Sequence, residues 1–370
     1  MKAVQASLPP DLERGFHKGP PHKTSWTPRW CCSCGRRWRS SPPNWMPSWP
    51  ASPSWRRRIG RPCVGRTYGQ HGAPLSFGYK VAVWLAGVAE AAARLPEIRS
   101  RLLVASLSGP VGTLAGLGTQ GPEVLEGFAK ELRLGAAPIA WHARRGRIAE
   151  AGSWLAQLLG ALGKMAGDIA HLASTEVGEV AEAYVPGRGG SSAMPHKRNP
   201  VSCTVILAAQ AAAPGQAATL LQAMVVAHER PAGLWHAEWH ALPSLFGLAS
   251  GALREARSLA EGLEVDAARM RANLDITHGL LFADAAAARL GAKLGREAAH
   301  ALVEQAAGQV RDTGDSLQAV LARMPQVMEA GLDLSPAFDL RPATAAAAAW
   351  VEPAIREAEA VRASLRAAVG

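Results

Sequence analysis

The sequence lacks the features that mark membrane-spanning, fibrous and disulfide-stapled proteins. It contains no run of about 20 uncharged apolar residues, no signal-peptide pattern at its N-terminus, and only five cysteines in 370 residues. It also lacks an internal repeat, a dinucleotide-binding fingerprint and a P-loop. We therefore expect a soluble, cytoplasmic protein with more than one sizeable core and no membrane partner.

The formal net charge of +10 lies entirely in the first 64 residues. This segment holds 12 lysines and arginines against two acidic residues, whereas residues 65–370 hold 28 of each sign. It also holds six of the 12 tryptophans, 11 of the 26 prolines and four of the five cysteines. Repeated prolines exclude long helices, and the tryptophans follow neither a helical nor a strand period. We predict an irregular segment over residues 1–64.

Three interpretations of this segment stay open. A basic, tryptophan-bearing arm could bind single-stranded nucleic acid, or Cys31, Cys32, Cys34 and Cys63 could hold zinc. Alternatively, the segment is translated out of its proper frame, which explains its charge, tryptophan, cysteine and proline content together. We favour this third interpretation, because the cysteines do not form two ligand pairs at zinc-site spacing. We therefore expect no metal and no nucleic-acid partner.

Residues 65–370 have the pattern of an all-α protein. Apolar residues recur every three or four positions in an alanine- and leucine-rich sequence, and we find no alternating strands. We predict a long-helix bundle over residues 65–262 and a smaller helical domain over 263–370. The expected helices are about Phe77–Val104, Gly121–Leu134, Ile148–Tyr184, Val201–His228, Ala241–Gly262 and Asp266–Leu274, with Pro96 and Pro214 kinking or interrupting two of them. Alanine-rich stripes fit either packing within one subunit or a homo-oligomer.

The most informative loop covers residues 187–200. Its first half is glycine-rich, and its second half places serine, Lys197 and Asn199 before Pro200, which opens a helix. These donors suit an anion: a hydroxyl beside a lysine can move a proton while Lys197 and Asn199 stabilise a developing negative charge. The alternative is a solvated flexible loop whose serines cap a helix.

The run Gly190–Pro200 resembles the signature loop of the fumarase/aspartase superfamily. The resemblance implies an all-helical bundle, a homotetramer and active sites built from several subunits. It also implies that Ser191 is the catalytic proton-transfer residue and that catalytic Lys197, together with Asn199, holds a substrate carboxylate. Ser192 and Met194, in the same run, are expected to bind substrate.

A second segment, Gly65–Pro74, also resembles this superfamily, with Thr67, Gln70 and His71 as expected substrate-binding residues. The sequence departs from fumarases and adenylosuccinate lyases at Tyr68 and Thr204. Those families have a histidine and a glutamate there. This double departure resembles the cycloisomerase branch, as do His228–Arg230, Gly233–Trp239 and Gly262–Asp275.

The cycloisomerase resemblance implies a reaction without metal or cofactor. It converts 3-carboxy-cis,cis-muconate, a small tricarboxylate, to 4-carboxymuconolactone in protocatechuate degradation. The alternatives are a lyase of the adenylosuccinate or argininosuccinate type, which releases fumarate, and an inactive helical scaffold. The family's N-terminal Thr-Ser-x-Asp motif has no counterpart in residues 1–64, so we expect an impaired site.

The other notable side chains have structural interpretations. His236 and His240 are four residues apart, as in a helical metal site, but the sequence offers no third ligand. We expect Trp235 and Trp239 in a core or an interface. Glu176 and Glu179 are expected to be solvated helix residues, and Cys203 is expected to be a small buried residue.

Overall fold

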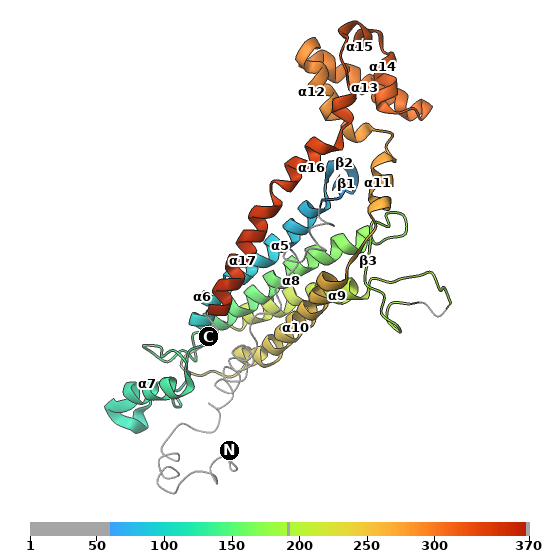
Figure 1. Cartoon of the computed structure of the whole chain (residues 1–370). Coiled ribbons are helices and arrows are strands. Elements are labelled where there is room, and N and C mark those ends of the chain that lie inside the picture. The colour runs from blue at the N-terminus through green and yellow to red at the C-terminus, as the bar shows by residue number, and fades with distance from the viewer. Residues whose placement is uncertain (1–59, 191–192, 368–370) are drawn as a thin grey trace.

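The computed structural model describes residues 60–190 and 193–367. Helices dominate this part of the chain, which confirms the all-α prediction. Figure 1 shows an elongated molecule in which long helices run side by side, with a compact helical unit at one end and α7 at the other. Cys31, Cys32 and Cys34, and residues 1–59 of the predicted irregular segment, lie outside the described residues.

The bundle consists of five long helices. They are α5 (Phe77–Ala93), α8 (Gly146–Leu172), α9 (Val201–Gln222), α10 (Glu238–Gly262) and α17 (Val351–Ala367). α8 is the central helix and packs against α5, α9 and α10. Its glycines permit the close approach to α9: a Cβ on Gly152 would lie 2.2 Å from a methyl carbon of Leu220, and one on Gly163 would lie 2.7 Å from Gln210.

The helix boundaries differ from the prediction mainly where a helix ends. α5 stops at Ala93 and α6 (Leu95–Leu102) begins with Pro96 in its first turn, so this proline interrupts the helix as predicted. Pro214 does not interrupt α9. By length and composition, α9 is the one described helix that could span a membrane, which differs from the expectation that the sequence holds no such run; α8 and α10 pack along it. α7 (Gly121–Leu132) matches its predicted start.

A β-hairpin precedes the bundle, and here the prediction of no strands was wrong. β1 (Pro62–Thr67) pairs antiparallel with β2 (Gln70–Ser76), and the turn between them is Tyr68-Gly69, both with positive φ. A bulge at Gly65 breaks the register between Val64 and Arg66. The bulge removes the strict alternation by which strands are recognised, and Tyr-Gly is not a common hairpin turn sequence.

A buried carboxylate ties this hairpin to the rest of the protein. Glu179 is completely buried and accepts hydrogen bonds from both terminal nitrogens of Arg66, at 2.6 and 3.2 Å, and from Nδ2 of Asn273 at 2.8 Å. Its backbone N–H donates to the Leu172 carbonyl, and its carbonyl accepts from the Asp266 N–H. The prediction that Glu179 is solvated was therefore wrong, since α8 ends at Leu172 and the chain turns inward.

Two short strands continue the chain beyond this carboxylate. β3 (Val180–Ala181) pairs with β4 (Glu264–Val265), and α11 (Ala267–Asp275), which carries Asn273, packs on β1. Glu179 thus joins the hairpin, the end of α8 and α11.

The C-terminal part forms a second, smaller core. Its main helices are α12 (Ala283–Leu294), α13 (Arg296–Thr313), α14 (Leu317–Arg323) and α15 (Pro325–Ala330). Leu290, Leu302 and Leu321 are buried among them. α16 (Leu340–Ala348) and α17 then return to the bundle, where Ile355 packs in the main core. We propose that the smaller unit covers residues 283–338, a narrower range than the predicted 263–370.

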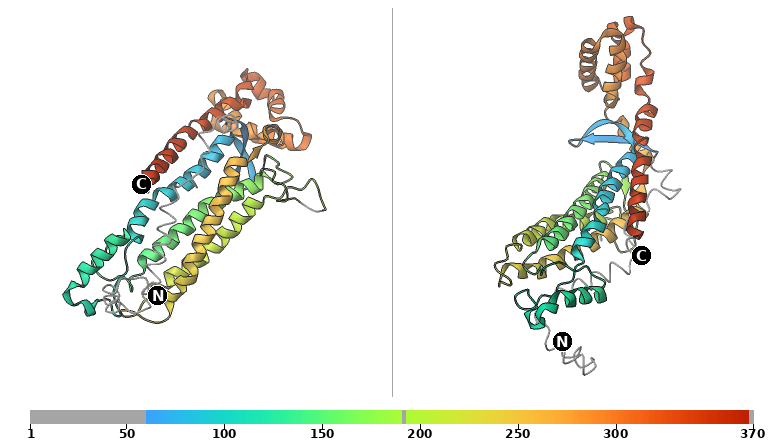
Figure 2. Two further views of the ribbon diagram at one scale, coloured as in Figure 1. Left: turned by 60° about the horizontal axis from the view of Figure 1, so that its bottom comes forward. Right: turned by 90° about the vertical axis from the view of Figure 1, so that its left-hand side faces the viewer.

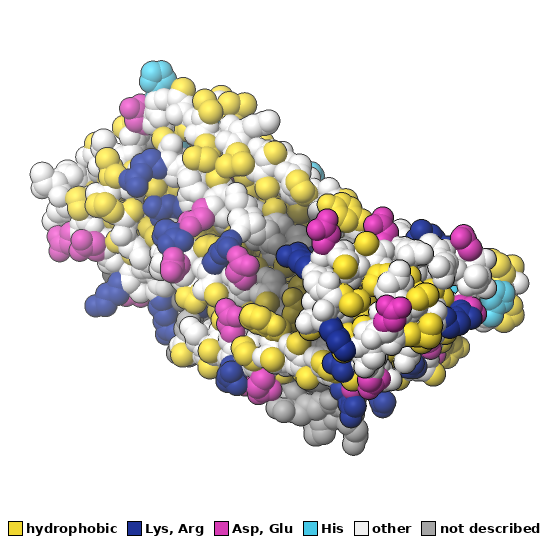
Figure 3. Space-filling view, turned by 90° about the horizontal axis from the view of Figure 1, so that it is seen from above, with side chains coloured by type: hydrophobic (Ala, Val, Ile, Leu, Met, Phe, Trp, Pro, Cys, Tyr) yellow, Lys and Arg dark blue, Asp and Glu magenta, His cyan; other side chains and the backbone are white. Residues whose placement is uncertain are grey.

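The short 3-10 helices connect these elements. They are η2 (Ala115–Gln120), η3 (Leu234–Ala237), η4 (Leu280–Phe282) and η5 (Ser335–Phe338). Figure 2 shows α17 lying along α5, with the hairpin beyond the end of the bundle. Figure 3, which views the molecule from the end that carries the C-terminal unit, shows acidic and basic side chains interspersed on that face.

The buried ion pair gives a stability prediction. Glu179→Gln removes the negative charge and leaves the guanidinium of Arg66, which is only 9% exposed, without its counter-ion. We expect the free energy of unfolding to fall by about 3 kcal/mol or more, as measured by urea titration followed by circular dichroism.

The matched control is Glu176→Gln, which changes an exposed side chain three residues away. It should alter the unfolding free energy by no more than about 0.5 kcal/mol. Equal stability of the two variants would show that the Arg66–Glu179 pair does not hold the hairpin in place.

Candidate functional site

The loop that the sequence singled out projects from the bundle between β3 and α9 (Figure 1). Its base is closed by a bridge between Gly190 and Arg198 and by two hydrogen bonds to the Gly189 carbonyl. The donors are the Asn199 backbone N–H at 2.8 Å and its Nδ2 at 3.1 Å. Gly189 has a φ of +75°, and a Cβ there would lie 2.9 Å from the Asn199 carbonyl oxygen, so the closure requires glycine.

Two charged residues anchor this loop on the side of α9. The Glu182 carboxylate accepts hydrogen bonds from the N–H groups of Ser202 and Cys203, at 3.0 and 2.9 Å, and so caps the first turn of α9. Arg198 forms two 3.0 Å bonds to the Glu264 carboxylate and a 2.5 Å bond to the Glu182 carbonyl. The two ends of the loop are therefore held at one place.

A third anchor connects the loop to α10. Arg188 pairs with Glu255 and donates to the Ser202 hydroxyl at 2.9 Å, and that hydroxyl donates to Glu255 at 2.9 Å. Burial raises the pKa of the Glu255 carboxyl, but the hydrogen bonds from Arg188 and Ser202 outweigh this and leave the pKa below its ordinary value. Glu255 thus stays ionised as the partner of Arg188. Sequence reasoning missed all of these anchors.

The tip of the loop carries the predicted chemistry. Ser191 and Ser192 lie outside the described residues. Met194 and Lys197 are exposed and belong to one turn, in which the Lys197 N–H donates to the Met194 carbonyl at 3.0 Å. Lys197 can therefore reach a ligand, whereas Asn199 uses one amide N–H in the closure and keeps its carbonyl oxygen and second N–H. Buried Cys203 has a raised pKa, because of burial and the adjacent Glu182, and packs as expected.

The second predicted group lies on the hairpin. Thr67 and Gln70 face each other at its exposed end, and His71 is paired across the strands with Arg66. Burial and the nearby Arg66 charge lower the pKa of His71, and its Nδ1 is buried with no hydrogen-bond partner in the described chain. His71 is therefore a neutral imidazole. Cys63, one of the candidate zinc ligands, is buried in β1, and burial raises its pKa to about 12, which disfavours the thiolate.

The two predicted groups lie on different segments of the chain. Thr67, Gln70 and His71 share the hairpin, and Met194, Lys197 and Asn199 share the loop. In the part of the chain that is described, no hydrogen bond or ion pair joins Thr67 or Gln70 to Lys197 or Asn199. The two segments are connected at their bases, where Arg66 meets Glu179.

A second polar cluster, which the sequence did not indicate, lies before the N-terminus of α8. Arg145 forms a buried ion pair with Glu238, the first residue of α10. The ring of His142 stacks edge-on against Trp235 with centroids 4.7 Å apart, and His236 lies against the same ring at 4.1 Å. No group of three possible metal ligands occurs among the described residues. Trp235 is buried as expected, whereas Trp239 is 54% exposed.

His142 is expected to make the stability of the folded chain depend on pH. The residue is 6% exposed and its Nε2 is buried without a hydrogen-bond partner among residues 60–190 and 193–367. Burial, with the charges of Arg230 and Arg145, lowers its pKa to about 4. An unfolded histidine has a pKa of about 6.5, so the unfolded chain binds this proton more tightly than the folded chain.

We therefore expect the melting temperature to fall as the pH is lowered from about 6.5 towards 4. The contribution of neutral His142 to folding stability is fully present above about pH 6.5, the pKa of histidine in the unfolded chain, and is lost as the pH falls from there towards 4. Thermal scans at half-unit pH steps measure the slope of the melting temperature against pH. His142→Gln keeps a neutral side chain and should make this slope smaller. An unchanged slope would show that other groups cause the loss of stability at low pH.

Comparison with known proteins places this geometry in a family. Residues 61–215, which include the hairpin and the loop, match a family described as Lyase. The solved structure of 3-carboxy-cis,cis-muconate lactonizing enzyme from Pseudomonas putida superposes with a TM-score of 0.80 at 41% identity, over 90% of this chain and 74% of that chain. The fold and the loop thus define the class of all-helical lyase-type proteins. The chain belongs to the fumarase/aspartase superfamily, within the group that includes the 3-carboxy-cis,cis-muconate cycloisomerases.

Two curated relatives show the range of that group. The 3-carboxy-cis,cis-muconate cycloisomerase of Pseudomonas aeruginosa is 46% identical over 303 residues, which are 81% of this chain and 66% of that protein. The nitrosuccinate lyase of Streptomyces davaonensis is 45% identical over 274 residues, 72% of this chain and 58% of that protein. The chain therefore spans 58% to 66% of the length of these two curated relatives.

Proposed function

We propose that this protein is a cofactor-free cycloisomerase that converts 3-carboxy-cis,cis-muconate to 4-carboxymuconolactone. The observation that carries the proposal is the anchored loop with its exposed Lys197, in a run whose sequence also contains Ser191, together with the 46% identity to a cycloisomerase of that name. The same proposal includes a cytoplasmic location and a reaction that needs neither a metal nor a cofactor.

The proposed reaction needs anion stabilisation and one proton. A substrate carboxylate oxygen adds to a carbon–carbon double bond, and the displaced electron pair moves onto a neighbouring carboxyl group. Lys197, Asn199 and loop N–H groups stabilise this charge, and Ser191 delivers a proton to the adjacent carbon. Ser192, Met194, Thr67, Gln70 and His71 position the substrate.

A lyase reaction is the second candidate, and the 45% identity to a nitrosuccinate lyase favours it. An adenylosuccinate- or argininosuccinate-type lyase would cleave its substrate and release fumarate. Such elimination removes one proton from carbon and often donates another to the leaving group. The two candidates therefore differ in product and in the number of proton-transfer groups that they need.

The test follows the absorbance of the conjugated diene of 3-carboxy-cis,cis-muconate with the full-length protein. Ser191→Ala should lower kcat by about a hundredfold or more, because it removes the proton donor, and should leave the circular dichroism spectrum unchanged. Ser100→Ala, on an exposed part of α6, is the matched control and should retain full activity.

Three results would contradict this proposal. Loss of the diene at the same rate in Ser191→Ala would remove the serine from the reaction. Release of fumarate from a succinyl substrate, without conversion of the muconate, would establish the lyase instead. Inactivity on both substrates by a folded protein would favour the scaffold.

We further propose that the protein is a homotetramer. α9 contains no charged residue, and only 28% of its most apolar window is buried within the chain. Val205, Ala208, Ala212 and Gly215 are exposed and share one face of the helix, where they form an uncharged strip. Such a strip on a bundle helix is typical of an interface, and assembly would bring the hairpin of one subunit towards the loop of another.

Light scattering after size exclusion tests this assembly. Ala208→Glu and Ala212→Glu place charges on the strip and should shift the mass from four subunits to two or one, because each buried unpaired charge is costly. Ala298→Glu, on an exposed face of α13, is the control and should leave the mass unchanged. A monomeric wild-type protein would overturn the proposal.

A further inference from the structure

The turn of the hairpin carries an aromatic side chain that the described chain leaves uncovered. Tyr68 is fully exposed, and among the described large hydrophobic side chains it is the most exposed. Its φ is +52°, in the left-handed region that favours glycine. We propose that the Tyr68 ring contacts the substrate and selects a planar, conjugated polycarboxylate over a saturated one.

The turn needs this backbone conformation but does not need this residue. Thr67 pairs with Gln70 across the strands, so Tyr68 and Gly69 form a two-residue turn, and both have positive φ. Asn-Gly is a preferred sequence for such a turn. The left-handed conformation costs energy for tyrosine because its Cβ crowds the following carbonyl oxygen. The hairpin would therefore be more stable with asparagine in place of Tyr68.

Leu114 shows what a structural reason for such strain looks like. It also has a positive φ, of +51°, but its side chain is buried, so its packing offsets the cost. Tyr68 gains no such packing in the described chain. Strained residues that the fold itself does not use are concentrated at functional sites.

The neighbours of Tyr68 suit a small molecule better than a partner surface. Thr67 and Gln70 flank the turn, are exposed, and carry neutral hydrogen-bonding groups. Within the hairpin, residues 62–76, Tyr68 is the one large hydrophobic side chain that is exposed. A protein interface is marked by a contiguous apolar patch, whereas one ring between polar groups matches a ligand with a flat apolar face and polar ends.

The hairpin holds the ring in a fixed place. The pairing of β1 with β2 fixes the backbone on both sides of the turn, and Arg66 ties β1 to the buried Glu179 at 2.6 Å. A tyrosine side chain has only two torsions to restrict. The ring can therefore bind a ligand at a low cost in conformational entropy.

The substrate contact rests on the proposed function, since it takes 3-carboxy-cis,cis-muconate as the ligand. The conjugated diene of this compound gives it a flat apolar face between its carboxylates. An aromatic ring stacks well on a flat π-system, but the tetrahedral carbons of a succinyl substrate offer no such face. Tyr68 thus gives a physical reason for a preference for the muconate over the substrates of the lyase candidate.

The first test is substitution of Tyr68 in the full-length protein. Tyr68→Asn should raise the urea midpoint of unfolding, because asparagine adopts a positive φ at lower cost. It should also raise KM for 3-carboxy-cis,cis-muconate about tenfold with little change in kcat, because the ring binds substrate and transition state alike. Tyr68→Phe keeps the ring and should keep KM within about threefold of the wild type. Arg133→Gly, which relieves a positive φ at the end of α7, is the matched control and should leave KM unchanged.

The second test measures selection by shape. cis,cis-Muconate and adipate are dicarboxylates with the same carbon chain, with and without the two double bonds, so competitive inhibition by this pair isolates the flat face. The wild type should bind cis,cis-muconate about tenfold more tightly than adipate. Tyr68→Asn should reduce this ratio, whereas Tyr68→Phe should preserve it. A merely structural role of Tyr68 would not change the ratio.

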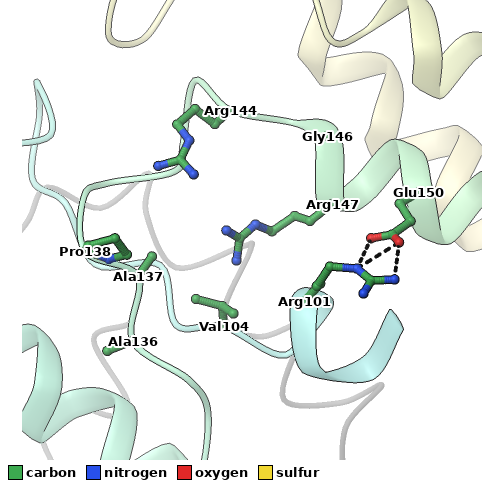
Figure 4. Close-up of a pocket in the computed structure, with 9 residues that line it drawn as sticks. All are labelled: Arg101, Val104, Ala136, Ala137, Pro138, Arg144, Gly146, Arg147 and Glu150. Carbon is green, nitrogen blue, oxygen red and sulfur yellow. Dashed lines mark hydrogen bonds and ion pairs between the residues drawn. The ribbon is translucent and has the colours of Figure 1, made fainter. Parts of the chain in front are cut away.

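A pocket of about 450 Å³ offers a control site (Figure 4). It lies at the start of α8, whereas the hairpin is tied to Glu179 beyond the other end of that helix. The Arg101–Glu150 ion pair forms part of its wall. Ala136→Glu places a carboxylate in an exposed part of this wall and should leave KM and the inhibition ratio unchanged. A raised KM in this variant, with wild-type values in Tyr68→Asn, would place the substrate in the pocket and overturn the proposal.

The remaining outcomes separate the Tyr68 contact from the proposed function. Conversion of the muconate by the wild type, with an unchanged KM and ratio in Tyr68→Asn, would overturn the contact and leave the function standing. Calorimetric binding without conversion, weakened in Tyr68→Asn, would support the contact and contradict the function. Neither binding nor conversion by the wild type would overturn both. A smaller mass of Tyr68→Asn in light scattering would show that a second copy covers the ring and would overturn the contact.

Discussion

The fold of this protein around its candidate site depends on one buried carboxylate. Glu179 cannot be buried as an ion unless its charge is paired and its oxygens accept hydrogen bonds, and Arg66 and Asn273 meet both needs. These residues come from the hairpin, from the turn after α8 and from α11, so the pair fixes three segments that are distant along the chain. Thr67 and Gln70 follow Arg66 directly, and the loop follows Glu179 after β3. The position of both candidate substrate-binding groups is therefore set at their common base.

The loop combines a fixed base with an accessible tip. Glu182, Arg188 and Arg198 form hydrogen bonds that hold both ends of the loop against α9, α10 and β4, and the closure at Gly189 leaves no room for a side chain. The side chain of Lys197 at the tip is exposed and forms no hydrogen bond or ion pair with the residues that the structure describes. Electrostatic stabilisation is effective when donors are positioned before the reaction. The ion pairs at the base of the loop hold its ends in place, and they do not involve the side chain of Lys197 at the tip.

The sequence predicted what is local and missed what is distant. Helical periodicity gave the bundle helices to within a few residues at their starts, and the run Gly190–Pro200 identified the loop because adjacent residues carry the signal. The hairpin was missed because a bulge at Gly65 interrupts its alternation. Glu179 was assigned to solvent because its partner Arg66 is 113 residues away, and the Arg188–Glu255 anchor spans 67 residues. No local pattern records such pairs, so their burial becomes visible only when the helices are packed.

The two departures from the fumarase pattern favour a reaction with a single proton transfer. The Thr204 hydroxyl donates to the Pro200 carbonyl at 2.8 Å within the first turn of α9, and a hydroxyl held this way is a poor base. Tyr68 is fully exposed at the hairpin turn. It has a positive φ, a backbone conformation that costs conformational energy for residues other than glycine. Tyr68 and Thr204 form no hydrogen bond with each other in the described chain, so these two positions do not reproduce the His–Glu acid–base pair of fumarases. Addition of a carboxylate to a double bond requires only one proton donor, the role proposed for Ser191, whereas elimination with a basic leaving group requires a base and an acid. The residues at these two positions are thus better matched to cyclisation than to the release of fumarate.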